Sequence, residues 1–267
     1  MTNKILQRAY AYPFDLPERS CVFVNGRLFG LQSFAAEEPC RSEITLNDRQ
    51  LKLGDLITAI GVEEPHDVTG RRLVLGYGSN ASLTSLRRKF GATGRDEVIP
   101  VVASRVRQLD VVYSAHIARY GSIPATLQVS RDTVVTVHGL LLSPEQLQVL
   151  HATEPNYYFA RLGGVDVETE FGESHSEVEA YVSRHGCLRL SDSEAALEAI
   201  PAERRHFPEL SQPSVIEAVR DKLRVRGSVE AFIRENVTDP GLAKRRTAVL
   251  RNDAAPFAWR DIKRLTD

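Results

Sequence analysis

The sequence predicts an α+β protein in which a strand-rich middle part carries an extension at each end. Between residues 71 and 182, apolar and β-branched residues occur in runs of strand length. From residue 187 onward, apolar residues recur with the spacing of amphipathic helices. The chain of 267 residues is long enough for a core domain with extensions. We therefore expect an N-terminal extension at 1–70, a core at 71–182 and a C-terminal helical extension at 183–267.

Composition and charge argue against several classes of protein. The formal net charge of −1 gives no sign of a nucleic-acid or membrane-surface partner. No apolar run is long enough to cross a bilayer, and the first ten residues contain no signal core. Cys21, Cys40 and Cys187 are odd in number and widely spaced, as expected of reduced thiols. With no Cys-x-x-Cys or His-x₃-His pair, we expect a cytoplasmic protein without a metal or other cofactor.

A β-hairpin is predicted in the N-terminal extension. The apolar runs Val22–Val24 and Arg27–Phe29 flank Asn25-Gly26, a pair that adopts the positive φ angles of a tight turn. A second apolar patch follows at Leu56–Val62, and the polar run Glu63–Asp67 has the composition of a linker.

The core begins with a strand that ends in a turn. The run Leu73–Gly76 is apolar, and helical spacing follows at Leu83, Leu86 and Phe90. Between them lies Tyr77-Gly78-Ser79-Asn80. A turn of small residues before a helix directs several backbone N–H groups toward one point, and such a concavity binds carboxylates, phosphates or oxyanions. The sequence therefore predicts an anion site at this turn.

Further strands and one helix complete the predicted core. A helix is expected from Ser143, because Ser143 can cap it, Pro144 suits its first turn and Gln146 occupies the capping-box position. The predicted strands are Val98–Val102, Leu109–Tyr113, Asp132–Leu142, Val165–Val167 and Val178–Val182.

This helix should end near Thr153, because Pro155 disfavours helical geometry at Glu154. Glu154 therefore stands at the end of an element, where its side chain can point into a cleft.

The C-terminal zone carries helix-start signals. Ser191–Glu194 and Ser214–Glu217 are both capping-box patterns, and Ser228–Val237 predicts a further short helix. The residues expected to share one buried helix face are Val215, Val219 and Leu223. The basic tail from Ala243 is interpreted as a solvated helix face.

The order of motifs in the core resembles the γ-glutamylcyclotransferase-like superfamily. The turn Tyr77–Asn80 after an apolar strand is similar to the signature of that family. Ala103–Tyr113 and Gly121–Leu127 resemble its next strand region and its small-residue segment. Gly139–Leu142, the helix after it and Leu150–Glu154 resemble the strand, helix and catalytic glutamate of the family.

The resemblance covers about residues 72 to 182 and implies both a fold and a reaction. The implied fold is a mixed sheet that closes into a small, partly open barrel with flanking helices. The implied enzyme is an acyl transferase for a small-molecule γ-glutamyl substrate. In its reaction the α-amino group attacks the γ-carbonyl, 5-oxoproline forms, and an amine or amino acid leaves. The chain departs from the pattern at Gly76 and Ala81, where the family commonly has alanine and leucine, and in the short segment after Glu154.

The chemistry of this reaction assigns roles to particular residues. An attacking α-amine has a pKa of about 8 and must lose its proton, so a base is needed at neutral pH. Glu154 is the candidate catalytic base, and it can return the proton to the leaving nitrogen. The substrate carboxylate and the developing oxyanion need hydrogen-bond donors. The candidate substrate-binding residues are Tyr77, Gly78, Ser79, Asn80 and, at the rim, Tyr157.

Other interpretations stay open. The turn could be an ordinary strand–helix connection capped by Asn80 or Ser82, with Glu154 a solvated helix-end carboxylate. A non-catalytic module could bind a small carboxylate at the same turn. His151 could assist Glu154, and Ser79 could be a nucleophile, although it lacks a Gly-x-Ser-x-Gly elbow. The basic C-terminal helices could bind an acidic partner, and the extensions could cap the cleft or form a homodimer.

Overall fold

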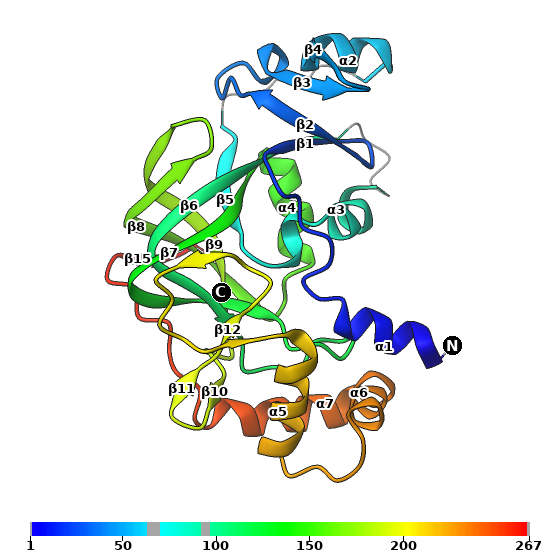
Figure 1. Ribbon diagram of the computed structural model, residues 1–267, viewed down its shortest axis with the longest axis vertical. Helices are drawn as coiled ribbons and strands as arrows, with labels where there is room; N and C mark the ends of the chain where they lie inside the picture. The colour runs from blue at the N-terminus through cyan, green and yellow to red at the C-terminus, as the bar shows by residue number, and fades with distance from the viewer. Residues whose placement is uncertain (1, 63–69, 92–96, 266–267) are drawn as a thin grey trace.

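The computed structural model describes residues 2–62, 70–91 and 97–265, and its centre is a closed barrel (Figure 1). Its strands pair around the full circle, from β6 to β7, β5, β9, β8 and back to β6. The β5–β9 pair is parallel and the other pairs are antiparallel, so the sheet is mixed. The barrel strands are β5 (Arg72–Gly76), β6 (Val98–Tyr113), β7 (Ala125–Leu142), β8 (Tyr157–Thr169) and β9 (Ser174–Ser183). The predicted α+β class is confirmed, and the barrel closes completely.

Two barrel strands are longer than the sequence pattern predicted. Val98–Val102 and Leu109–Tyr113 belong to the single strand β6, and Asp132–Leu142 is only the second part of β7. The register of β6 shifts between Arg107 and Leu109, where Gln108 has a φ of 62°. Such a bulge bends a strand without ending it, and the polar residues around it resemble a turn in the sequence.

The N-terminal hairpin is confirmed. Strand β1 (Cys21–Val24) pairs with β2 (Arg27–Ser33), and the turn residues Asn25 and Gly26 have φ angles of 41° and 87°. Strand β1 also pairs with β6, so the hairpin continues the barrel sheet. The next elements are η1 (Pro39–Arg41), β3 (Glu43–Leu46), β4 (Arg49–Lys52) and α2 (Leu53–Ala59). The predicted linker 63–67 lies outside the described residues.

The elements that carry the candidate site follow the local signals. The turn after β5 becomes the short 3₁₀ helix η2 (Ser79–Ala81), and α3 (Leu83–Phe90) follows with Ser82 as its cap. Helix α4 (Pro144–Ala152) has the complete capping box predicted for it and ends at Thr153. Glu154 is therefore the first residue after the C-terminal cap of the helix.

The predicted helix start at Ser191–Glu194 is wrong. This segment forms a small hairpin of β10 (Arg189–Leu190) and β11 (Ser193–Glu194), in which Ser191 has a left-handed φ of 57°. Gln128 of β7 donates a hydrogen bond of 2.9 Å to Oε1 of Glu194. The side chain expected to complete a capping box is therefore used in a tertiary contact. Three further short strands follow: β12 (Ala196–Leu197), β13 (Ala202–Glu203) and β14 (Glu209–Leu210).

The later C-terminal helices are largely as predicted. Helix α5 (Gln212–Lys222) is capped by Ser211 rather than Ser214, and its Val215 and Val219 are buried. The short helix predicted at Ser228–Val237 is confirmed as α6, and Ser228 caps it. The remaining elements are α6 (Val229–Thr238), α7 (Pro240–Arg251) and β15 (Ile262–Arg264), which pairs with β8. Among the described residues, none of the helices has the length and apolar character that crossing a membrane requires.

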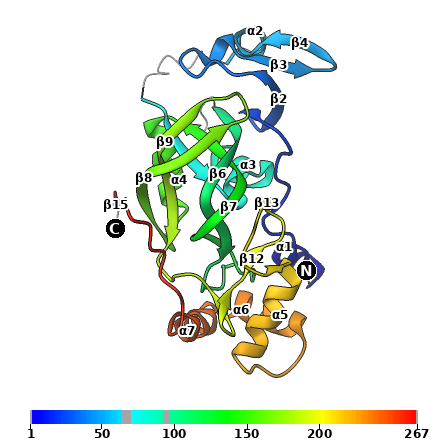
Figure 2. The same ribbon diagram turned by 60° about the vertical axis from the view of Figure 1, so that its left-hand side comes forward.

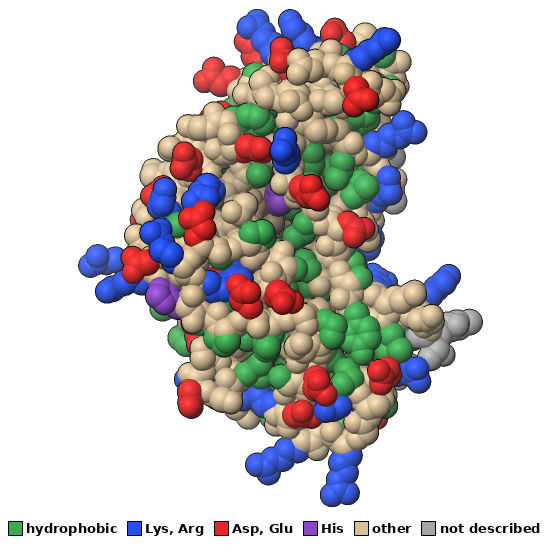
Figure 3. Space-filling model, in the orientation of Figure 1, with side chains coloured by type: hydrophobic (Ala, Val, Ile, Leu, Met, Phe, Trp, Pro, Cys, Tyr) green, Lys and Arg blue, Asp and Glu red, His purple; other side chains and the backbone are tan. Residues whose placement is uncertain are grey.

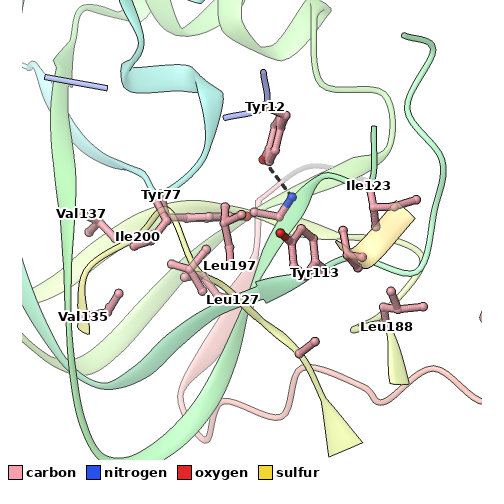
Figure 4. Packing of buried hydrophobic residues seen from close by; sticks show 14 of the residues in the cluster. Tyr12, Tyr77, Tyr113, Ile123, Leu127, Val135, Val137, Leu188, Leu197 and Ile200 are labelled. Atoms are coloured by element: carbon pink, nitrogen blue, oxygen red, sulfur yellow. Dashed lines mark hydrogen bonds between the residues drawn. The ribbon is translucent and has the colours of Figure 1, made fainter. Parts of the chain in front are cut away.

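The molecule is elongated, with the N-terminal strands at one end, the barrel in the middle and α5–α7 at the other end (Figures 1 and 2). Helix α1 (Thr2–Tyr10) lies against α5 and α6, so the two chain extensions meet below the barrel. The core is filled by apolar side chains, among them Leu127, Val135 and Val137 (Figure 4). Because this interior is packed, a ligand site has to lie at the rim of the barrel.

Candidate functional site

A cavity of about 980 Å³ lies beside the ends of barrel strands β5, β7 and β8. Helix α1, the turn after β5, the β6–β7 loop and the end of α4 supply most of its wall. Residues 237, 238 and 240, from the end of α6 and the start of α7, close it on another side. In the space-filling view the outline of the molecule is indented on the right, above α1 (Figure 3). Both chain extensions therefore help to enclose the cavity.

The cavity brings together the six residues proposed from the sequence for catalysis and substrate binding. Its lining includes Tyr77, Gly78, Ser79 and Asn80 from the turn, together with Glu154 and Tyr157 from the segment after α4. The turn and Glu154 are far apart in the chain, and they meet because β5 lies beside β7 and β9 in the barrel.

The sequence interpretation missed Lys89, which connects the two halves of the site. Its Nζ donates hydrogen bonds of 2.6 Å to Oε1 of Glu154 and of 2.6 Å to Oδ1 of Asn80. Because two bonds of 2.6 Å meet at one nitrogen, the Asn80 and Glu154 oxygens are at most about 5.2 Å apart. We call Asn80, Lys89 and Glu154 the cavity floor.

The cavity floor is shielded from water. The Lys89 side chain is 2 % exposed and that of Glu154 is 13 % exposed. Burial lowers the pKa of Lys89, and the neighbouring Glu154 carboxylate opposes this change. No hydrogen bond from the described part of the chain reaches the second oxygen of Glu154, Oε2. That oxygen is available to a ligand.

The position of Lys89 carried one weak signal in the sequence. It lies three residues after Leu86 and next to Phe90, so helical spacing puts it on the apolar face of α3. A charged residue on a buried face needs a partner, but the sequence does not say which one.

The side chain of Tyr77 has a structural role. Its ring is buried, and its hydroxyl donates a hydrogen bond to the backbone carbonyl of Tyr181. Burial raises the pKa of Tyr12, Tyr77 and Tyr157 well above the ordinary tyrosine value, so these hydroxyls stay protonated.

Gly78 is required by a close contact. A β-carbon at this position would lie 2.5 Å from the hydroxyl oxygen of Tyr12. That hydroxyl accepts a 2.8 Å hydrogen bond from the amide of Ala125, drawn as the dashed line in Figure 4. The contact holds the segment after α1 against the barrel.

Tyr157 contributes a half-buried aromatic wall. Its hydroxyl donates a 2.9 Å hydrogen bond to the carbonyl oxygen of Ala125, and its ring meets His116 edge-on. Burial, with a further effect of the nearby His185, holds the pKa of His116 well below its usual range. His116 therefore lines the cavity as a neutral group.

Two other candidates from the sequence are placed differently. His151 does not line the cavity, and its Nδ1 is 2.8 Å from the hydroxyl of Tyr181. Ser79 lines the cavity, but no histidine among the described residues is hydrogen-bonded to it. In the described part of the chain, His151 therefore forms no hydrogen bond with Glu154, and Ser79 lacks the histidine partner of a hydrolase nucleophile.

The outer part of the cavity carries cationic side chains, which we call the cavity mouth: Lys4, Arg8, Arg88 and Arg119. All four are exposed. Blue side chains border the indentation of the surface in Figure 3. Among the described residues, no group of three or more His, Cys, Asp or Glu side chains is arranged to hold a metal ion. The described lining of the cavity thus offers one carboxylate at its floor and positive charge at its mouth.

Several solved structures are similar to this chain at low sequence identity. No family model matches the chain, and no curated protein matches it. A protein from Arabidopsis thaliana solved in solution is 18 % identical with a TM-score of 0.34, covering 45 % of this chain and 74 % of its own.

Two further solved structures are similar at 13 % identity. An uncharacterized protein from Homo sapiens has a TM-score of 0.37, covering 64 % of this chain and 100 % of its own. A gamma-glutamyl cyclotransferase has a TM-score of 0.35, covering 71 % of this chain and 91 % of its own. The chemistry of the cavity rests on its own residues.

Proposed function

We propose that this protein is a γ-glutamyl cyclotransferase-like enzyme that releases 5-oxoproline from a γ-glutamyl amine or amino acid. The observation that carries the proposal is the shared cavity, in which Glu154 and the Tyr77–Asn80 turn are joined through Lys89. The cavity volume of about 980 Å³ leaves room for a leaving group beside the γ-glutamyl unit.

The proposed reaction uses one base for two proton transfers. The α-amino nitrogen attacks the γ-carbonyl carbon and forms the new C–N bond of the ring. Oε2 of Glu154 accepts the proton of the attacking amine and then gives it to the leaving nitrogen as the original amide bond breaks. Atoms balance without any co-reactant: one γ-glutamyl compound gives 5-oxoproline and one free amine.

The surrounding groups would act on geometry and charge. The first backbone N–H groups of a helical turn have no partner within it, so those of η2 are suited to the substrate carboxylate or the oxyanion. Lys89 is a positioning residue, because it fixes Oε1 of Glu154 and leaves Oε2 for the amine. The aromatic walls favour a folded glutamyl chain, and holding that near-attack geometry supplies much of the rate gain expected of such an enzyme.

The test is the variant Glu154→Gln, with 5-oxoproline measured by mass spectrometry from a panel of γ-glutamyl compounds. We expect turnover to fall by about 10²–10⁴-fold, the usual contribution of a general base. The fold should persist, since the Gln side chain can still accept the hydrogen bond from Lys89. The matched control is Glu145→Gln, an exposed glutamate in the first turn of the preceding helix, which should keep full activity. Retained activity in Glu154→Gln would refute the role of Glu154.

A second candidate is a non-catalytic module that binds a small carboxylate. The observation that favours it is the ion pair itself, because a carboxylate bound to Lys89 can serve as a fixed charge for a ligand amine. This alternative predicts that γ-glutamyl-alanine binds in calorimetry while the wild-type protein releases no 5-oxoproline from any member of the panel.

A further inference from the structure

The cavity mouth gathers positive charge from three separate segments. Lys4 and Arg8 are one helical turn apart on α1, Arg88 lies on α3, and Arg119 lies in the β6–β7 loop. None of the four forms a salt bridge or hydrogen bond with a carboxylate in the parts of the chain that the structure describes. Only one acidic residue, Glu154, appears in the described lining, and Lys89 already neutralises it.

This concentration of charge is not a general property of the protein. The whole chain has a formal net charge of −1. Some arginines elsewhere pair with acidic residues, as Arg105 does with Glu203 and Arg161 with Glu177. Like charges one turn apart on a helix, as at Lys4 and Arg8, destabilise it slightly. A bound anion would relieve this repulsion.

The cavity mouth is within reach of the cavity floor. The guanidinium carbon of Arg8 lies 5.1 Å from the ring centre of Tyr120. Burial raises the pKa of the Tyr120 hydroxyl. The positive charges of Arg88 and Arg8 lower this pKa, and the Glu154 carboxylate raises it, so these three charges all act on one ring. A ligand that extends from Glu154 past Tyr120 would therefore meet the arginines.

A γ-glutamyl unit brings one carboxylate, and the turn amides suffice for it. The four cations of the cavity mouth are therefore not needed to bind this carboxylate. We propose, on the basis of the proposed function, that the leaving group is an acidic amino acid whose carboxylates bind at Lys4, Arg8, Arg88 and Arg119. The substrate class is then a γ-glutamyl compound of glutamate or aspartate, rather than of a neutral or basic amine.

The experiment compares kcat/KM for γ-glutamyl-glutamate and γ-glutamyl-glutamine, which have nearly the same size and differ by one charge. We expect the acidic compound to be preferred by about tenfold, as for one charge-assisted contact. In the double variant Arg8→Gln/Arg88→Gln the ratio should fall toward one. The matched control is Arg87→Gln, whose native side chain lies outside the cavity lining and donates to the carbonyl of Gly26. This control should keep the wild-type ratio.

Equal kcat/KM values for the two compounds in the wild-type protein would overturn the proposal, and so would an unchanged ratio in the double variant. Turnover of neither compound would count against the proposed function instead. In that case the Kd values of the two compounds, measured by calorimetry, test the charge selection directly. Equal Kd values would overturn it, and a preference for the acidic compound that is lost in the double variant would support it.

Discussion

The floor and the mouth of the cavity handle charge in opposite ways. At the floor, the buried Lys89 is paired with Glu154, whose side chain is largely shielded from water. At the mouth, Arg8 and Arg88 are exposed and have no acidic partner among the described residues. A buried charge must find its partner within the protein, because desolvation without one costs several kcal/mol. An exposed charge remains hydrated, so it needs no partner within the protein and can pair with a charged group of the ligand.

The largest effect on stability should come from breaking the pair at the floor. In Lys89→Met the Glu154 carboxylate loses its partner while staying mostly buried, so we expect the free energy of unfolding to fall by about 3 kcal/mol. Urea titration measures this change. The double variant Lys89→Met/Glu154→Gln should recover most of the loss, because it leaves no unpaired charge. A loss of less than about 1 kcal/mol in Lys89→Met is what an exposed ion pair would give. That result would show that the charges of the cavity floor and the cavity mouth do not differ in their effect on stability.

A smaller effect should follow from a change at Gly78, whose contact with Tyr12 holds the segment after α1 against the barrel. In Gly78→Ala the new β-carbon would meet the hydroxyl of Tyr12 at 2.5 Å, so the segment that follows α1 has to move. We expect a loss of about 1–3 kcal/mol, as for overpacking in a core, together with a higher KM because Lys4 and Arg8 move with α1. The control Gly30→Ala places its β-carbon in open space and should lack both effects. Normal stability of Gly78→Ala in thermal unfolding would show that the contact is dispensable.

The smallest effect should come from a change of salt concentration, which distinguishes the exposed charges of the cavity mouth from the shielded pair of the cavity floor without any mutation. Raising the salt concentration from about 0.05 M to about 0.5 M screens exposed charges much more than buried ones. We expect KM for γ-glutamyl-glutamate to rise about threefold, while kcat, which depends on the floor, changes little. Steady-state kinetics at several salt concentrations measure both constants. If kcat and KM respond equally, the two regions do not differ in screening.

Much of the fold could be predicted because its signals are local. The Asn25-Gly26 turn, the capping box of Ser143 and the cap at Ser228 are each settled by φ preferences or hydrogen bonds within a few residues. Prediction failed where a tertiary contact competed with such a signal. At Glu194 a hydrogen bond from Gln128 replaces the capping box, and at Gln108 a bulge continues a strand that the sequence pattern breaks.

By itself, the sequence determined the two halves of the candidate site: a turn of small residues at Tyr77–Asn80 and a carboxylate, Glu154, just beyond a capped helix. Only the tertiary structure decided that they share a cavity, that Lys89 joins them and that α1 brings cations to its mouth. The physical reason is the separation along the chain over which each kind of interaction acts. Caps and turns act over three or four residues, whereas Lys89 and Glu154 are 65 residues apart and meet only because the barrel has closed.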